Sequence, residues 1–199
     1  MMKLIFIRHF KTKGNQERRY VGVTDESIEQ PWLCHQKNKE SFEYPKAECV
    51  IVSPKKRCLE TAQYLYPNCV PMVIKAFEEC DFGDFEYKNH EELEQDIRYQ
   101  KWVDSNGQLP FPNGESREIF QDRCVEAFCH IISQLIEDHI QSVAFVVHGG
   151  TIMSIMEAFG YPHKEYFDWQ VENGHGFMGW LNENQWKQGN KMVEEECTL

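Results

Sequence analysis

Short apolar runs alternate with helical stretches along this 199-residue chain, and this alternation limits the fold more than any other feature. Runs without interspersed polar residues are typical of strands that are buried on both faces. The pattern therefore predicts an α/β fold with a mostly parallel sheet and helices on both faces. Strands are expected at 3–7, 49–52, 71–76 and 143–147, with weaker strands at 176–181 and 191–195. Helices are expected at 54–66, 115–138 and 151–159.

Two of the helical segments carry further signals. The segment 54–66 has Ser53 as a candidate N-cap and Pro54 at the first helical position, which is a favoured arrangement at a helix start. The segment 89–104 is more polar and aromatic than a core helix. We therefore expect an insertion at about 84–113 that caps a functional site, within one domain spanning 1–199.

Charge and composition exclude several classes of protein. The formal net charge is −11, which disfavours nucleic acid and anionic membranes as partners. No apolar run approaches the roughly 18 residues of a membrane helix, and the start of the chain does not have the layout of a signal peptide. The eight cysteines form no C-x-x-C pair, which favours free thiols in a reducing compartment. A cytoplasmic protein is the expectation, and the oligomeric state is not readable.

Three strand exits carry cations or imidazoles. The strand at 3–7 leads into Arg8 and His9, and the strand at 143–147 leads into His148. The strand at 49–52 is followed by Arg57, which falls in the first turn of a helix. Because parallel strands present their carboxyl ends at one edge of the sheet, these side chains are expected to meet in one pocket. Six basic residues and a single acidic one, Glu17, occupy the first 20 positions.

The chemistry of this set fits a phosphate group. The planar guanidinium of arginine matches phosphoryl oxygens, and Gly149 and Gly150 let a helix N-terminus approach an anion. Arginines beside an imidazole lower its pKa, so it stays neutral and nucleophilic. A leaving alkoxide also needs a proton donor. Acids crowd the stretch FEECDFGDFE, and spacing alone does not select one of them: Glu78, Glu79, Asp81, Asp84 and Glu86.

Several motifs, in order along residues 3–151, resemble those of the histidine phosphatase (phosphoglycerate mutase-like) superfamily. IRHFKTKGN is similar to the R-H-G-x-T-x-x-N signature, and YVGVTDESI to the loop that follows it. SPKKRCLETA is similar to S-P-x-x-R-x-x-x-T-A, and FEECDFGDFE to L-x-E-x-x-F-G-x-W-E. PNGES and VVHGG match the remaining motifs.

The resemblance assigns roles to residues. It implies that His9 is the phosphorylated nucleophile and that Glu79 is the proton donor. It implies that phosphoryl oxygens are held by Arg8, Arg57 and His148. Substrate-binding roles then fall to Asn15, Tyr20, Thr24 and the backbone of Gly149. It also implies a doubly wound α/β fold with one antiparallel edge strand, and a reaction without cofactor or metal.

Two departures from the family pattern lie near the expected site. Phe10 stands where the family usually has glycine, and Phe85 replaces the usual tryptophan. The side chain of Phe10 is expected to alter either the rim of the pocket or the approach of the substrate. The segment 28–44 lacks the usual G-x-x-Q-A helix start, so its role is open.

The predicted activity is hydrolysis of a small phosphorylated metabolite through a phosphohistidine. Within the superfamily the chain is most similar to the α-ribazole phosphatases of cobalamin biosynthesis, through DFGDFE, YQKWVD and VENG. Tyr99, Trp102 and Phe111 would either stack on a flat base or pack the insertion onto the domain. A broad-specificity sugar or nucleotide phosphatase and a phosphoglycerate mutase remain alternatives. An inactive member that binds a phosphorylated ligand is an alternative of another class.

Overall fold

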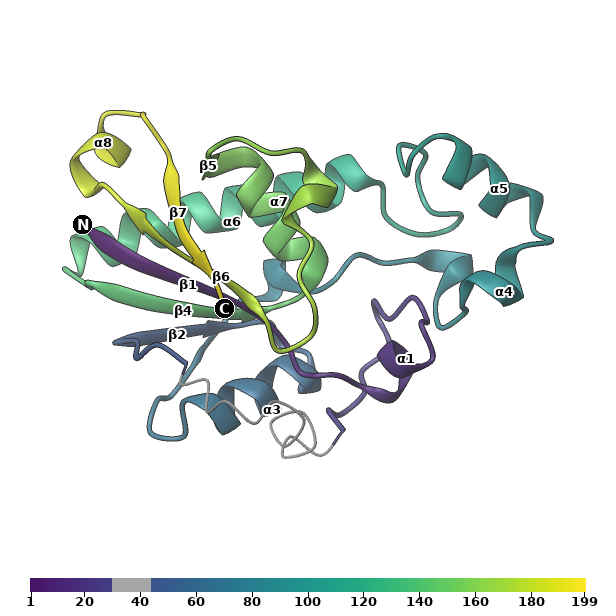
Figure 1. The fold of residues 1–199 in the computed structure, drawn as a ribbon, viewed down its shortest axis with the longest axis horizontal. Helices are drawn as coiled ribbons and strands as arrows, with labels where there is room; N and C mark the ends of the chain where they lie inside the picture. Colours follow the sequence, from purple (N-terminus) through teal and green to yellow (C-terminus); the bar gives the residue numbers. More distant parts are fainter. Residues whose placement is uncertain (30–43) are drawn as a thin grey trace.

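A computed structural model describes residues 1–29 and 44–199, and the open question about 28–44 falls almost wholly outside them. Seven strands in the described residues form one sheet in the order β3-β2-β4-β1-β6-β7-β5 (Figure 1). The strands are β1 (Met2–Arg8), β2 (Cys49–Val52), β3 (Met72–Val73), β4 (Ser142–Val147), β5 (Gly160–Tyr161), β6 (Gly176–Leu181) and β7 (Val193–Thr198).

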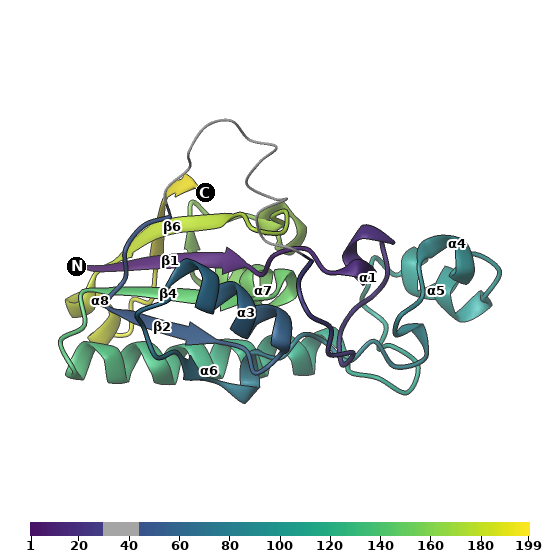
Figure 2. The same cartoon turned by 90° about the horizontal axis from the view of Figure 1, so that it is seen from below.

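The helices surround this sheet. The α-helices are α1 (Lys13–Gln16), α3 (Lys56–Leu65), α4 (His90–Leu93), α5 (Ile97–Asp104), α6 (Arg117–Glu137), α7 (Gly149–Phe159) and α8 (Glu183–Lys187). Short 3-10 helices are η1 (Lys75–Phe77), η2 (Gly83–Phe85) and η3 (Tyr166–Trp169). The long helix α6 runs along one face of the sheet with α7, and α3 covers the opposite face (Figure 2).

The alternation of side chains along β1 explains why both faces are covered. Leu4 and Phe6 join the core that α6 and α7 complete, whereas Ile5 and Ile7 join the core against α3. Phe6 stacks on Phe145 of β4 with ring centroids 5.2 Å apart. A strand with apolar residues at every position is thus buried on both sides, as its sequence predicts.

The predicted fold class is confirmed, with differences in detail. The sheet is mixed and mostly parallel, and its antiparallel strand is β6, which lies between β1 and β7 inside the sheet instead of at its edge. The strand expected at 71–76 pairs only at Met72–Val73, because the chain then turns into η1. The segment 89–104 divides into α4 and α5.

The helix α3 begins later than predicted. Its N-cap is Lys55, whose side chain makes no capping bond. The hydroxyl of Ser53 accepts from the backbone N–H of Lys55 at 3.4 Å and lies 2.7 Å from Nε2 of His148. Ser53 is therefore not the N-cap residue, and its shorter contact is with His148.

A third apolar cluster connects the segment 84–113 to the N-terminal part of α6. Tyr99 and Phe111 pack there with Phe120 and Cys124 of α6. In Figure 1 the helices α4 and α5 lie at the end of the molecule to which β1, β2 and β4 point. This placement puts the segment beyond the carboxyl ends of the central strands. No helix among the described residues has the length and apolar character needed to cross a membrane.

Helix α6 offers a matched pair for testing the core. Ile132 is fully buried and Ile119 is 60% exposed. We expect Ile132→Ala to lower the free energy of unfolding by about 2–5 kcal/mol, because it removes apolar contacts and leaves a cavity. Ile119→Ala should change it by less than about 0.5 kcal/mol. Urea unfolding followed by circular dichroism measures both, and equal losses would contradict the described orientation of α6.

Candidate active site

The register of β1 against β4 brings two histidines together. Arg8 at the end of β1 pairs with Val147 at the end of β4, and the backbone N–H of His9 donates to the carbonyl of Val147 at 2.9 Å. The next residue on β4 is His148, so the two imidazoles lie side by side with ring centroids 5.3 Å apart. Both are buried. Residues 139 positions apart in the chain thus form the centre of the predicted site.

The hydrogen bonding of His9 selects its reactive nitrogen. Nδ1 lies 2.7 Å from the carbonyl oxygen of Phe10, which only accepts, so Nδ1 carries the proton and Nε2 keeps its lone pair. Burial, followed by the charges of Arg57 and Arg8, holds the pKa of His9 well below its usual range. The imidazole is therefore neutral near pH 7, as a nitrogen nucleophile requires.

The pKa of Glu79 is shifted in the direction opposite to that of His9. Oε1 of Glu79 accepts from the backbone N–H of Cys80 at 3.0 Å, and its Oε2 from Gly150 at 3.4 Å. Burial raises the pKa of Glu79, and this effect outweighs those hydrogen bonds and the charges of Arg57 and Arg8, which lower it. The carboxyl group is thus stabilised in the protonated form that a general acid needs.

The Nε–H group of Arg8 is a hydrogen-bond donor without a partner among the described residues. One Nη atom of the same guanidinium donates to the carbonyl of Val171 at 2.8 Å, while the Nε atom is buried. A side chain at Gly149 would place its Cβ 3.4 Å from this Nε. The glycine therefore keeps open the space beside an unpaired cationic N–H group, which is a favourable position for an anion.

Arg57 is fully buried and mostly occupied by the protein itself. Its Nη2 donates to the carbonyls of Val21 and Gly22 at 3.1 and 3.0 Å, and its Nη1 donates to that of Thr24 at 2.7 Å. Its Nε lies 3.3 Å from Nδ1 of His148. Only one N–H of Nη1 is left over, so most of this arginine's binding capacity holds the 21–24 loop.

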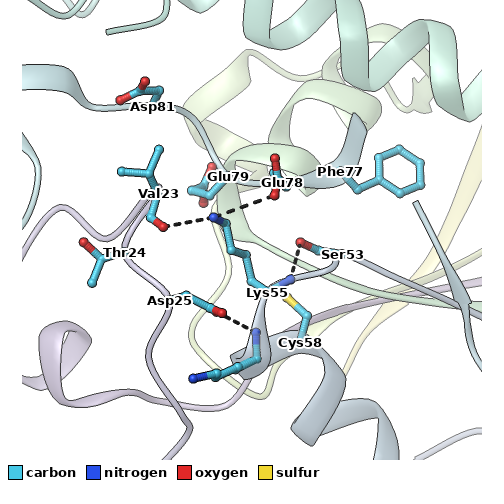
Figure 3. Close-up of polar contacts among 12 residues, drawn as sticks. Val23, Thr24, Asp25, Ser53, Lys55, Cys58, Phe77, Glu78, Glu79 and Asp81 are labelled. Carbon is cyan, nitrogen blue, oxygen red and sulfur yellow. Dashed lines mark hydrogen bonds and ion pairs between the residues drawn. The ribbon is translucent and has the colours of Figure 1, made fainter. Parts of the chain in front are cut away.

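Two neighbouring lysines reinforce the same loop (Figure 3). Lys55 donates through Nζ to the carbonyl of Val23 at 2.9 Å and forms an ion pair with Glu78 at 3.7 Å. The backbone N–H of Lys56 donates to Oδ1 of Asp25 at 2.7 Å. The start of α3 is thereby fastened to the loop that borders the site.

His148 contacts three side chains: Arg57, Ser53 and Cys58, whose Sγ lies 3.5 Å from Nε2. Nδ1 accepts from Arg57, because a guanidinium only donates, so Nε2 carries the proton and donates to Oγ of Ser53 at 2.7 Å. Burial, and then the nearby charge of Arg57, hold the pKa of His148 well below its usual range. The structure places this imidazole against His9, and its contact with a phosphoryl oxygen stays a prediction.

A cavity of about 270 Å³ opens from this centre. Six of the predicted site residues line it: Arg8, His9, Asn15, Tyr20, Glu79 and Gly149. The amide of Asn15 accepts at Oδ1 from Asn173 at 3.2 Å. Three predicted site residues, Arg57, His148 and Thr24, do not contribute to the described lining. The carbonyl of Thr24 holds Arg57 instead, and its predicted contact with substrate stays a prediction.

Aromatic side chains form much of the remaining lining. We call them the aromatic wall: Tyr20, Phe82, Trp102, Phe111, Phe120, Tyr166 and Phe167. Two of the three aromatics singled out in the sequence, Trp102 and Phe111, belong to it. The third, Tyr99, is 3% exposed and packs behind the wall, where its hydroxyl lies 3.0 Å from that of Tyr20.

Phe10 does not reach the cavity, contrary to the expectation that it affects the rim. Its side chain is 1% exposed and lies edge-on to Tyr44 and Tyr64. Its backbone N–H donates to Oγ1 of Thr61 at 2.9 Å. The phenylalanine is therefore accommodated on the α3 side, and its carbonyl fixes the tautomer of His9.

Sequence reasoning missed two residues. Ser53, which binds His148, sits in the motif SPKKR but was interpreted as a helix cap. Arg117 lines the cavity, although nothing in its spacing from the strand exits indicates this. The family motif S-P-x-x-R contains Ser53 and so marks it as a candidate site residue. No motif marks Arg117, whose position at the cavity depends on how α6 packs against the rest of the fold.

Comparison with known proteins decides the family. A family model described as histidine phosphatase superfamily (branch 1) matches residues 4–187. The chain belongs to the histidine phosphatase superfamily. Membership makes it a phosphatase, in agreement with the sequence-based prediction, and the small phosphorylated substrate follows from the same assignment. No curated protein sequence matches this histidine phosphatase.

Solved structures share the fold over nearly the whole chain. A putative α-ribazole-5′-P phosphatase from Escherichia coli str. K-12 substr. MG1655 has a TM-score of 0.79 at 23% identity, and covers 98% of this chain and 94% of its own. The α-ribazole phosphatase from Shigella flexneri has a TM-score of 0.77 at 24% identity, with 98% and 95% covered. A phosphoserine phosphatase from Entamoeba histolytica has 0.76 at 21% identity, with 100% and 96% covered.

The protonation state of His9 can be tested directly. We expect its imidazole to remain neutral and protonated at Nδ1 well below pH 6.5, because burial and two arginines disfavour the cation. Nitrogen chemical shifts of the ¹⁵N-labelled imidazole across an acid titration measure this. The chain unfolded in urea serves as control and should titrate near pH 6.5. Titration of folded His9 at or above the unfolded value would contradict the described burial.

Proposed function

We propose that this histidine phosphatase hydrolyses phosphomonoesters through a phosphohistidine at His9. The observation that carries the proposal is the pairing, at one cavity, of an imidazole whose pKa burial lowers with a carboxyl group whose pKa burial raises. With ordinary pKa values, an imidazole is neutral only above about pH 6.5, whereas a glutamic acid is protonated only below about pH 4.3. Here burial moves the two pKa values in the directions that let both forms coexist.

In the first step, Nε2 of His9 uses its lone pair to form a bond to phosphorus. The bond from phosphorus to the ester oxygen breaks, and its electron pair goes to the leaving oxygen. Glu79 gives its proton to that oxygen, which leaves as a neutral alcohol. Proton transfer matters most for an alkyl alcohol, because its alkoxide is a poor leaving group.

In the second step, Glu79 is a carboxylate and takes a proton from water as the water oxygen attacks phosphorus. The bond from phosphorus to Nε2 breaks, and its electron pair returns to His9. Glu79 and His9 are then restored to their starting states. Inorganic phosphate is the second product, and no cofactor enters the balance.

Three unpaired donors suit the negative charge that spreads over the phosphoryl oxygens. The Nε of Arg8 has no hydrogen-bond partner among the described residues. The N–H of Gly149 opens the eleven-residue helix α7, whose dipole favours an anion. Asn15 uses its Oδ1 within the protein and keeps its amide N–H groups. Fixed donors of this kind stabilise a phosphoryl transition state without reorganisation.

We propose α-ribazole 5′-phosphate, and hence a place in cobalamin biosynthesis, as the specific substrate. Structural similarity to two proteins described as α-ribazole phosphatases supports this, as does the aromatic wall, which suits a flat base. Similar structures described as phosphoserine phosphatases favour a second candidate substrate, the phosphate ester of a small aliphatic hydroxy acid such as phosphoserine.

A phosphate-release panel tests the activity. We expect wild type to release phosphate from p-nitrophenyl phosphate and, with higher kcat/KM, from α-ribazole 5′-phosphate. Sugar phosphates, nucleotides, phosphoserine and 3-phosphoglycerate complete the panel. His9→Ala should abolish turnover and the transient gain of one phosphoryl group in the mass of the intact protein. Equal inertness of wild type and His9→Ala would indicate a member that only binds phosphorylated ligands.

The proton donor can be tested by pH dependence. Wild-type kcat/KM should rise with pH as His9 loses its proton below pH 6.5, and fall as pH passes the raised pKa of Glu79. Glu79→Gln should remove the fall at high pH and slow an alkyl phosphate by about 10²–10⁴-fold. It should slow p-nitrophenyl phosphate much less, because that leaving group needs no proton. Glu78→Gln, at the neighbouring position, is the control, and an equal effect there would exclude Glu79 as the acid.

A further inference from the structure

Arg117, the first residue of α6, is fixed at the cavity wall from two sides. Its Cζ lies 4.0 Å from the ring centroid of Tyr166 and 5.4 Å from that of Phe167. One Nη lies 3.4 Å from Oε1 of Glu157, and the other carboxylate oxygen of Glu157 accepts from Gln121. The guanidinium is thus stacked on an aromatic ring and tethered by one long ion pair.

Most hydrogen-bond donors of Arg117 are unused. Its Nε is buried and has no partner among the described residues, and only one Nη donates to a protein acceptor there. An arginine side chain has five N–H donors, and the buried, unpaired Nε costs free energy. The N–H groups on the Nη atoms that have no acceptor among the described residues are available to a molecule bound in the cavity.

The surroundings of Arg117 favour a flat apolar partner. Trp102 and Phe111 lie 4.9 Å apart at an interplanar angle of 33°. A Cβ built at Gly107 would lie 3.4 Å from Trp102 and 3.9 Å from Phe167, so these two rings approach each other across the glycine. The aromatic wall thereby receives neighbouring rings from α5 and η3.

The charged residues of the cavity lining are mostly arginines. Arg8, Arg19 and Arg117 contribute guanidinium groups, and Glu79 is the single carboxyl group in the described lining. Arg19 is paired with Glu17 and Glu92, and Arg8 lies beside His9. Arg117 differs from both in lying over the ring of Tyr166 in the aromatic wall.

We propose that Arg117 is a specificity-determining residue, and that the substrate is a phosphomonoester whose leaving alcohol carries an aromatic ring with a hydrogen-bond acceptor. The proposal rests on the phosphatase function proposed above. The ring lies against the aromatic wall, and the acceptor receives an N–H from Arg117. A small aliphatic hydroxy acid would leave the aromatic wall facing water.

Two synthetic esters of the same shape test this role. Naphthylmethyl phosphate has no acceptor on its ring, whereas quinolinylmethyl phosphate carries a ring nitrogen, and both alcohols leave with similar ease. We expect wild type to prefer the quinolinyl ester by about tenfold in kcat/KM, because one hydrogen bond to a charged donor contributes on that order. Both should exceed phosphoserine by at least about tenfold. Arg117→Met should reduce the ratio between the two ring esters to near one.

The control variant is Arg98→Met. Arg98 also pairs with carboxylates, Asp84 and Asp96, but does not line the cavity, so the wild-type ratio should persist there. Thermal melting shows whether each variant is folded. An unchanged ratio in Arg117→Met, no preference in wild type, or faster turnover of phosphoserine would overturn the inference. If wild type then still cleaves p-nitrophenyl phosphate, the proposed function stands; if it cleaves no ester, both proposals fail.

Discussion

The parallel pairing of β1 with β4 is the constraint on which the site depends. It places His9 next to Val147 in the hydrogen-bond ladder and so sets His148 beside His9. A shift of one residue would send the side chains of β1 to the opposite faces of the sheet. The two apolar cores prevent that shift, since Phe6 stacks on Phe145 on one face and Ile5 packs towards α3 on the other. The arrangement of the site is therefore fixed by the packing of the apolar run 4–7 within β1.

Burial of ionisable groups also shapes the site. Arg57 is fully enclosed, and its guanidinium is compensated by three backbone carbonyls from the 21–24 loop and by His148. The same dry environment disfavours an imidazolium at His9 and a carboxylate at Glu79. Hydrogen bonds thus compensate the buried cation Arg57, while the same low-dielectric region lowers the pKa of His9 and raises that of Glu79.

The roles that we propose for catalysis and for selectivity fall to different parts of the chain. The groups proposed to react follow strands of the sheet. The aromatic wall and Arg117 come from α5, η3, the start of α6 and the loops that contain Tyr20, Phe82 and Phe111. This division is common in α/β proteins, whose ligands bind beyond the carboxyl ends of the strands.

The sequence by itself determined the sheet class and the order of the main elements, which follow from its apolar runs. Runs that stop at cations or imidazoles predicted a site with Arg8, His9, Arg57 and His148, and the motifs of the superfamily added Glu79 to that prediction. Only the tertiary structure decided that β6 lies inside the sheet, that Ser53 binds His148, and that Phe10 packs away from the cavity. It also decided which aromatics face the cavity, with Trp102 on the wall and Tyr99 behind it. Those outcomes depend on contacts between residues far apart in the chain, which local spacing and charge do not encode.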